Sequence, residues 1–83
     1  MNYVYIVECS DGTFYTGWTN SLEKRIDMHS NGTGAKYTRG RGPVKLVYCE
    51  EFDRKEDAMR REYHIKKLSR QQKLLLMNEN SLQ

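Results

Sequence analysis

Two tyrosine-containing triplets stand near the start of the chain, on either side of a turn sequence. The triplet YVY ends at Tyr5, the triplet YTG begins at Tyr15, and residues 10–12 between them read SDG. Glycine adopts positive φ at little cost and aspartate bonds its own backbone, so SDG predicts a hairpin turn. The turn would bring Tyr5 and Tyr15 onto neighbouring strands, where two phenol hydroxyl groups can form a polar site.

Three further side chains with catalytic chemistry fall on predicted helices. Arg25 and His29 are four residues apart, so they lie side by side on one helix. Glu62 shares one arc of a later helix with Ala58 and Ile65, and an unpaired carboxylate is costly to bury in an apolar stripe. Glu62 therefore either forms an ion pair, with Arg25 as one candidate partner, or holds a metal. For Arg25 and His29, the alternative to a functional role is a place on the helix surface.

The elements that must position these residues follow the order β-β-α-β-α-α. Aromatic and β-branched residues predict strands over residues 3–9, 13–17 and 44–51. Capping boxes predict helix starts at Asn20, Asp53 and Ser69, each with Glu or Gln three residues later. This order predicts an α/β fold, with a small three-stranded antiparallel sheet flanked by helices. We expect a single domain over residues 1–83, with its core at about 2–77 and a frayed C-terminal end.

Length and composition fit one small globular domain. The chain has 83 residues, of which 37% are hydrophobic and 30% charged. No apolar run reaches the ~20 residues of a membrane span, and the N-terminus does not resemble a secretory signal. We therefore expect a cytoplasmic protein without membrane contact. Cys9 and Cys49 are expected to be buried and reduced, and too few Cys and His residues are present for a zinc site.

Positive charge is concentrated in two segments. Residues 54–73 hold eight basic residues against three acidic ones, while the whole chain carries a net charge of +3. A glycine-rich loop at 32–42 adds cations around an aromatic ring that can stack on a base. These segments favour a polyanionic partner, and the alternative is a solvated surface. The candidate nucleic-acid contacts are Lys36, Tyr37, Arg39, Arg41, Arg61, Lys66 and Lys67.

Together these residues resemble the GIY-YIG nuclease domain over nearly the whole chain. The landmarks are the two triplets, the helix with its Arg and His, and the later helix with its Glu. The glycine-rich loop and the segment EYHIKKLSRQQK are similar to the small stand-alone bacterial proteins of the YhbQ/YazA type. The chain departs from the family pattern at three points. Tyr3 replaces the first Gly, Trp18 stands where several relatives carry Lys, and a later Asn has no clear counterpart nearer than Asn78.

The resemblance implies an endonuclease that hydrolyses phosphodiester bonds with one Mg²⁺ or Mn²⁺ ion. DNA is favoured over RNA as the expected substrate. Glu62 would be the metal ligand, and Arg25 would clamp a nonbridging phosphate oxygen. Tyr5 would act as the base, assisted by His29, and Tyr15 would position water or phosphate; the two tyrosines could exchange roles. Little sequence specificity is expected, so structure-selective cutting in DNA repair or recombination, or targeting by a protein partner, fits best.

Two other classes of protein are consistent with the same sequence. One is a nucleic-acid-binding module that has the fold without useful catalysis, which Trp18 and the missing Asn favour. The other is a scaffold that docks a protein through Trp18 and the last helix. Salt-sensitive association without cleavage would indicate the binding module. The absence of both nucleic-acid association and cleavage would indicate the scaffold.

Overall fold

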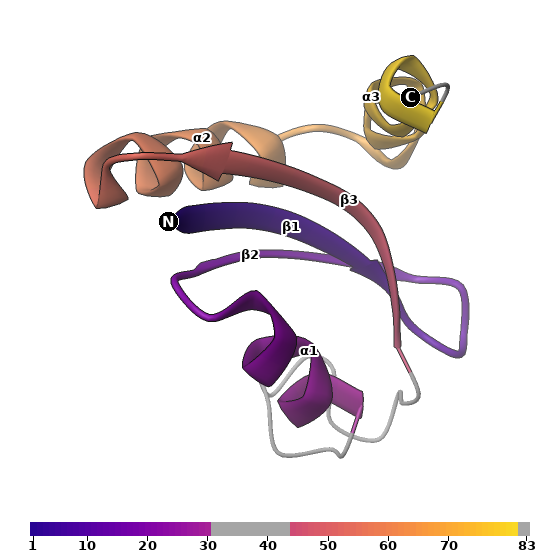
Figure 1. Ribbon diagram of the computed structural model, residues 1–83. Helices are drawn as coiled ribbons and strands as arrows, with labels where there is room; N and C mark the ends of the chain where they lie inside the picture. Colours follow the sequence, from indigo (N-terminus) through magenta and orange to yellow (C-terminus); the bar gives the residue numbers. More distant parts are fainter. Residues whose placement is uncertain (31–43, 82–83) are drawn as a thin grey trace.

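The computed structural model describes residues 1–30 and 44–81, and Figure 1 shows their arrangement as three strands and three helices. The predicted order β-β-α-β-α-α and the α/β class are confirmed. The last helix extends beyond the predicted core, and residues 82–83 lie outside the described residues. The elements are β1 (Asn2–Glu8), β2 (Phe14–Thr19), α1 (Leu22–Ser30), β3 (Lys45–Phe52), α2 (Lys55–Lys66) and α3 (Arg70–Ser81).

The first strand lies in the middle of the sheet. The strand order is β2-β1-β3, and β1 is antiparallel to both neighbours. Tyr5 therefore sits in the central strand, opposite Gly17 on β2 and Cys49 on β3. The predicted turn closes the β1–β2 hairpin: Gly12 has φ +84°, and the Asp11 carboxylate accepts a bond from the Thr13 amide at 3.1 Å.

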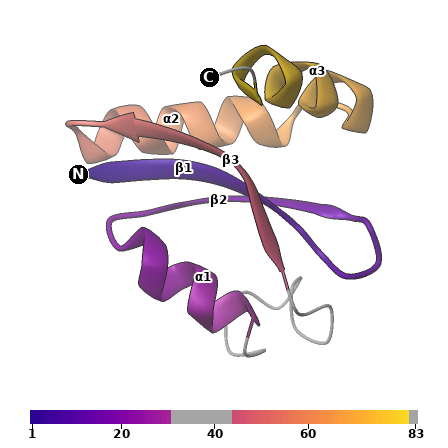
Figure 2. The ribbon, with the colours of Figure 1, turned by 45° about the vertical axis from the view of Figure 1, so that its right-hand side comes forward.

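Helices cover the two faces of the sheet unequally. In Figures 1 and 2, α2 and α3 lie on one side of the sheet and α1 on the other. Alternate residues of a strand point to opposite faces, so Val4 and Ile6 pack with Ala58 and Ile65 of α2. The intervening Tyr5 faces the side of α1. None of the helices in residues 1–30 and 44–81 is long and apolar enough to cross a membrane.

The helix caps agree with the sequence at one of three predicted positions. At α3 the capping box is confirmed, because the Ser69 amide bonds Gln72 Oε1 at 2.9 Å and the Gln72 amide bonds Ser69 Oγ at 3.2 Å. The prediction at Asp53 is wrong, since Arg54 is the N-cap of α2 and makes no side-chain cap. The Asp53 carbonyl instead accepts from the Asn2 amide group at 3.2 Å.

The start of α1 and the second cysteine also differ from expectation. The first turn of α1 closes from Arg25 N to Ser21 O at 3.0 Å, one residue after the predicted cap at Asn20. Cys9 is buried and free, as predicted, but Cys49 is exposed. The reason is that β3 is an edge strand and α2 covers the opposite face of the sheet at this position.

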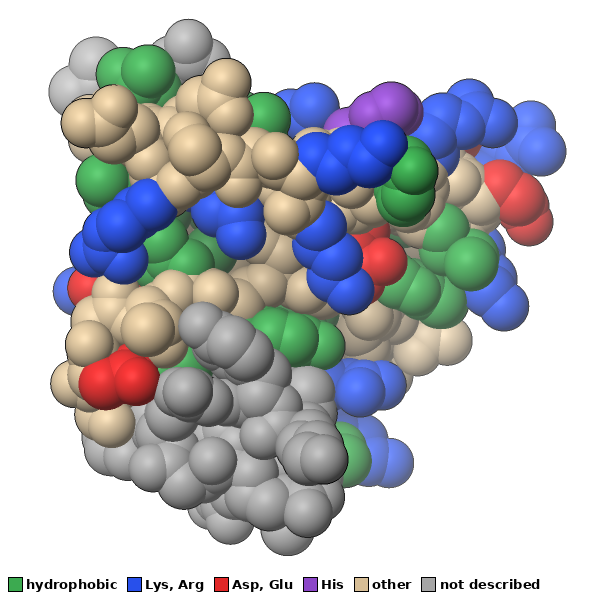
Figure 3. Space-filling model, turned by 180° about the vertical axis from the view of Figure 1, so that it is seen from behind, with side chains coloured by type: hydrophobic (Ala, Val, Ile, Leu, Met, Phe, Trp, Pro, Cys, Tyr) green, Lys and Arg blue, Asp and Glu red, His purple; other side chains and the backbone are tan. Residues whose placement is uncertain are grey.

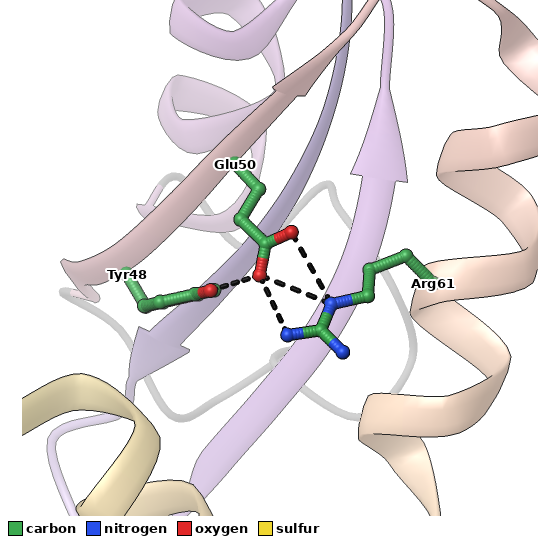
Figure 4. Close-up of polar contacts among 3 residues, drawn as sticks. All are labelled: Tyr48, Glu50 and Arg61. Carbon is green, nitrogen blue, oxygen red and sulfur yellow. Dashed lines mark hydrogen bonds and ion pairs between the residues drawn. The ribbon is translucent and has the colours of Figure 1, made fainter. Parts of the chain in front are cut away.

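A polar cluster ties α2 to β3. Arg61 makes a two-point contact with the Glu50 carboxylate, with Nη2 at 2.9 Å and Nε at 3.0 Å from Oε2. Figure 4 shows Tyr48 on the other side of the same carboxylate, to which its hydroxyl donates. Arg61, which the sequence predicts to contact nucleic acid, also has this intramolecular partner, and its contact with nucleic acid stays a prediction. Burial and the hydrogen bond to Glu50 raise the pKa of Tyr48 to about 12.

This shifted pKa predicts a loss of stability in alkali. An unfolded chain releases the Tyr48 proton near pH 10, whereas the folded chain holds it to about 12. The folded state thus binds more protons in that window, and its stability falls as the pH rises above ~10. The free energy of unfolding, measured in urea from pH 8 to 11, should fall less steeply for Tyr48→Phe than for the wild type. Equal slopes would contradict this assignment.

Candidate active site

A polar pocket opens at the free edge of β2. Its volume is about 240 Å³. It gathers four of the five predicted catalytic residues, from both tyrosine triplets and from the helices on either side of the sheet. The lining residues are Tyr5, Tyr15, Gly17, Trp18, Thr19, Asn20, Arg25 and Glu62.

The close packing of Tyr5 on Gly17 explains the glycine of the second triplet. Tyr5 is only 2% exposed, and it stands directly opposite Gly17 across the β1–β2 ladder. A β-carbon at position 17 would lie 2.5 Å from the Tyr5 hydroxyl oxygen and 2.7 Å from Cζ. It would also lie 3.2 Å from Cε2 of Tyr15. Only glycine leaves room for the two rings at this point of the sheet.

The surroundings of Tyr5 keep its phenol protonated. Burial is the largest cause that raises the pKa of Tyr5, and the proximity of Tyr15 raises it further. The positive charge of Arg25 lowers the pKa, while the negative charge of Glu62 raises it, and the net direction is upward. This direction is opposite to the one that the expected role of Tyr5 as a base requires.

Glu62 and Arg25 reach the pocket from opposite faces of the sheet. Arg25 projects from α1 and is exposed, whereas Glu62 projects from α2 and its side chain is 20% exposed. Glu62 Oε2 lies 3.6 Å from Lys66 Nζ, one helical turn later. Within the described residues, the expected ion pair of Glu62 is therefore made with Lys66 and not with Arg25.

Several predicted residues cannot be placed in the pocket. His29 belongs to α1, one turn after Arg25, but its side chain is outside the described part of the chain. The four loop positions Lys36, Tyr37, Arg39 and Arg41 lie outside the described residues as well.

The two lysines that close α2 have different neighbours. Lys66 adjoins the pocket through Glu62, whereas the Lys67 ammonium lies 4.2 Å from the centre of the Tyr63 ring. Such a cation–π contact leaves Lys67 on the surface of the helix, away from the residues that line the pocket.

Sequence reasoning missed two residues of the pocket wall and one neighbour of that wall. Thr19 and Asn20 line the pocket at the end of β2, and the Lys55 ammonium lies 5.5 Å from the ring centre of Trp18. The position of Thr19 and Asn20, two and three residues after the glycine of the triplet, was the available signal. Lys55 carried none, because its contact with Trp18 depends on how α2 packs on the sheet.

The pocket fits a weakly held divalent cation. No group of three His, Cys, Asp or Glu residues within the described ranges can hold a metal. Glu62 supplies one partly exposed carboxylate, which forms an ion pair with Lys66. Mg²⁺ and Mn²⁺ accept one protein carboxylate and take their remaining oxygens from water and phosphate.

Comparison with known proteins defines the class of this site. Residues 1–75 match the GIY-YIG catalytic domain, and the chain belongs to that family. Membership implies nuclease chemistry on a nucleic-acid substrate. Within the family, the chain is similar to the small UPF0213 proteins. It is 66% identical over 82 residues to the UPF0213 protein CPE1444 of Clostridium perfringens, and the match covers 99% of this chain and 88% of the relative.

Two solved structures share the fold. The solution NMR structure of the UPF0213 protein BH0048 from Bacillus halodurans is 56% identical, with a TM-score of 0.61, over 94% of this chain and 84% of that one. The solution NMR structure of EF2693 from E. faecalis is 39% identical, with a TM-score of 0.66, over 99% and 88%. The predicted resemblance to small GIY-YIG proteins is thus confirmed.

Proposed function

We propose that this protein is a divalent-metal-dependent endonuclease that hydrolyses phosphodiester bonds in DNA with little intrinsic sequence specificity. The observation that supports it most is the pocket at the edge of β2, where two phenols, a guanidinium and a carboxylate converge. Family membership supports the nuclease class. The position at a sheet edge leaves the pocket open to a long polymer.

Each charged residue has a role that suits its chemistry. The Arg25 guanidinium binds a nonbridging oxygen of the scissile phosphate, because its planar fork matches phosphate geometry. Glu62 would hold the cation, which would compete with the Lys66 ammonium for this carboxylate. When bound there, Mg²⁺ or Mn²⁺ supplies Lewis-acid stabilisation of the charge that develops on the phosphate.

The two tyrosines take different roles because their surroundings differ. Tyr5 is buried and its pKa is raised, so we assign it as a neutral hydrogen-bond donor. Tyr15 is only partly buried and lines the pocket, so we assign it as the phenol that orients the attacking water. His29 is the candidate that accepts the proton, since an unperturbed imidazole titrates near ~6.5. Tyr15 thus keeps the role that the sequence suggested, while the role of base moves from Tyr5 to His29.

The assignment predicts how Tyr5→Phe responds to pH. We expect its turnover to fall about 100- to 1000-fold, the effect of losing one transition-state donor. The shape of its pH–rate profile should match that of the wild type between pH 5.5 and 9.5, because Tyr5 does not titrate there. Tyr15→Phe is the matched variant. Loss of the ascending limb in Tyr5→Phe alone would identify Tyr5 as the base.

A nucleic-acid-binding module without catalysis is the second candidate. The ion pair of Glu62 with Lys66 favours it, because a metal ion must compete with the Lys66 ammonium for this carboxylate. The binding module would associate with nucleic acid in a salt-dependent way through Lys66 and its neighbours on α2.

One assay separates the two candidates. The wild type is incubated with duplex, single-stranded and branched DNA and with matching RNA, in Mg²⁺, Mn²⁺ or EDTA. We expect metal-dependent nicking of DNA, fastest on branched substrates, as suits DNA repair or recombination, and none in EDTA. Association without cleavage in either metal would establish the binding module instead.

A further inference from the structure

A second groove lies at the other end of β2, between the hairpin turn and the start of α3. Its volume is about 230 Å³, and it is lined by Thr13, Phe14, Arg70 and Lys73. Figure 3 shows the face that α2 and α3 share, with Lys and Arg side chains around a hollow. None of the four lining residues belongs to the catalytic pocket.

Arg70 is held in a fixed orientation at one wall of the groove. Its Nη1 donates to the Gly12 carbonyl at 2.7 Å, and its guanidinium carbon lies 4.5 Å from the centre of the Phe14 ring. A guanidinium carries five N–H donors, and within the described part of the chain Arg70 uses one of them. The remaining donors are pre-oriented for an oxyanion.

Lys73 stands beside Arg70 without a counter-charge. The two residues are three apart on α3, so they share a helix face. Among residues 1–30 and 44–81, no acidic side chain forms an ion pair with Lys73. Burial lowers the pKa of Lys73, and the charge of Lys66 lowers it further. Cations crowded in this way are stabilised by an anion between them.

Lys66 lies between the catalytic pocket and the groove in its interactions. It forms an ion pair with Glu62 of the pocket, and its positive charge lowers the pKa of Lys73 in the groove. From Phe14 to Gly17, β2 covers about 10 Å at ~3.3 Å per residue. A stacked nucleic-acid strand advances ~3.4 Å per nucleotide. One strand laid along β2 would therefore bring a second phosphate to the groove.

We propose that this groove binds a backbone phosphate of the substrate strand, within about three nucleotides of the bond that is cut. The proposal rests on the proposed function in that the ligand is a nucleic acid. A guanidinium fork and an ammonium are phosphate ligands, and they read no base sequence. The Thr13 hydroxyl is not counted among them, because it donates to the Asp11 carboxylate at 2.6 Å. The groove thus makes binding dependent on strand length and salt but not on sequence.

The test is binding of a fluorescein-labelled 20-nucleotide DNA in EDTA, measured by anisotropy at 50 to 300 mM salt. Lys73→Gln should bind about three- to tenfold more weakly, and its log K against log salt should be less steep by about 0.7 to 0.9, one phosphate contact. Lys45→Gln is the matched control, because Lys45 is exposed on β3, at the opposite edge of the sheet. It should behave as the wild type.

A single neutral methylphosphonate, moved along the strand, locates the contact. Wild-type affinity should fall at one linkage within about three nucleotides of the cut, and the affinity of Lys73→Gln should not change there. If the wild type cleaves DNA and Lys73→Gln binds DNA as tightly as Lys45→Gln, the proposed role of the groove is refuted and the proposed nuclease activity stands. Lys73-dependent binding without any cleavage would support the groove and refute the catalytic proposal. No binding of DNA or RNA would refute both.

Discussion

Glu62→Gln is expected to lower metal-dependent cleavage by about 10³-fold while DNA binding in EDTA stays close to that of the wild type. The amide keeps the shape of the side chain and removes the charge that a divalent cation needs. Glu62 is the one carboxylate among the residues that line the pocket, so no neighbour there replaces it. The loss should appear in single-turnover rates at every metal concentration.

The matched control for this prediction is Glu56→Gln. Glu56 lies on the same helix, its side chain is 64% exposed, and it pairs with Arg54 at 3.5 Å instead of facing the pocket. It should cut DNA at the wild-type rate. If Glu62→Gln cuts as fast as Glu56→Gln, the hydrolysis comes from another site or from a contaminant.

Gly17→Ala is expected to damage both the fold and the activity. The new methyl group would lie 2.5 Å from the hydroxyl oxygen of Tyr5, whose ring is buried in the central strand. Overpacking of this kind costs about 1–3 kcal/mol. Cleavage should fall by more than the loss of folded protein explains, since the displaced ring belongs to the pocket. Urea unfolding and cleavage at 20 °C measure the two effects.

A double-mutant cycle identifies Tyr5 as the cause. Tyr5→Phe removes the hydroxyl that the methyl group would meet first, so Gly17→Ala should cost less stability in that background. Ile65→Val, a core change away from the pocket, costs about 0.5–1.5 kcal/mol and should leave the rate of the folded protein unchanged. Additive effects of the two pocket substitutions would contradict the contact.

The sequence predicted those features that depend on local chemistry. The SDG turn and the capping box at Ser69 and Gln72 involve residues within three positions of each other, and both are confirmed. The cap predicted at Asp53 is wrong, since Arg54 is the N-cap of α2, and the Asp53 carbonyl accepts from the side-chain amide of the distant Asn2. The exposure of Cys49 likewise depends on which face of the sheet a helix covers.

The sequence predicted which residues line the candidate site, but it did not predict their pKa shifts. The motif resemblance pointed to Tyr5, Tyr15, Arg25 and Glu62, and these four line one pocket. The raised pKa of Tyr5 follows from burial in a central strand, which the sequence does not specify.

Among the charged residues of α2, ion pairs within the helix were predictable from the sequence, and ion pairs with another element were not. Lys66, one turn after Glu62, was a readable signal for its ion pair. The pairing of Arg61 with Glu50, eleven positions apart and on different elements, required the fold.

The most direct test of the central claim, that the pocket at the edge of β2 is the metal-dependent hydrolytic site, is the position at which Mn²⁺ binds. Amide NMR spectra of the labelled protein are recorded with substoichiometric Mn²⁺ and a phosphorothioate DNA that is cut slowly. We predict that the signals of Gly17, Arg25 and Glu62 broaden first, and that Glu62→Gln abolishes the effect. Broadening centred on the acidic first turn of α2, at Glu56 and Asp57, with the pocket unaffected, would contradict the claim.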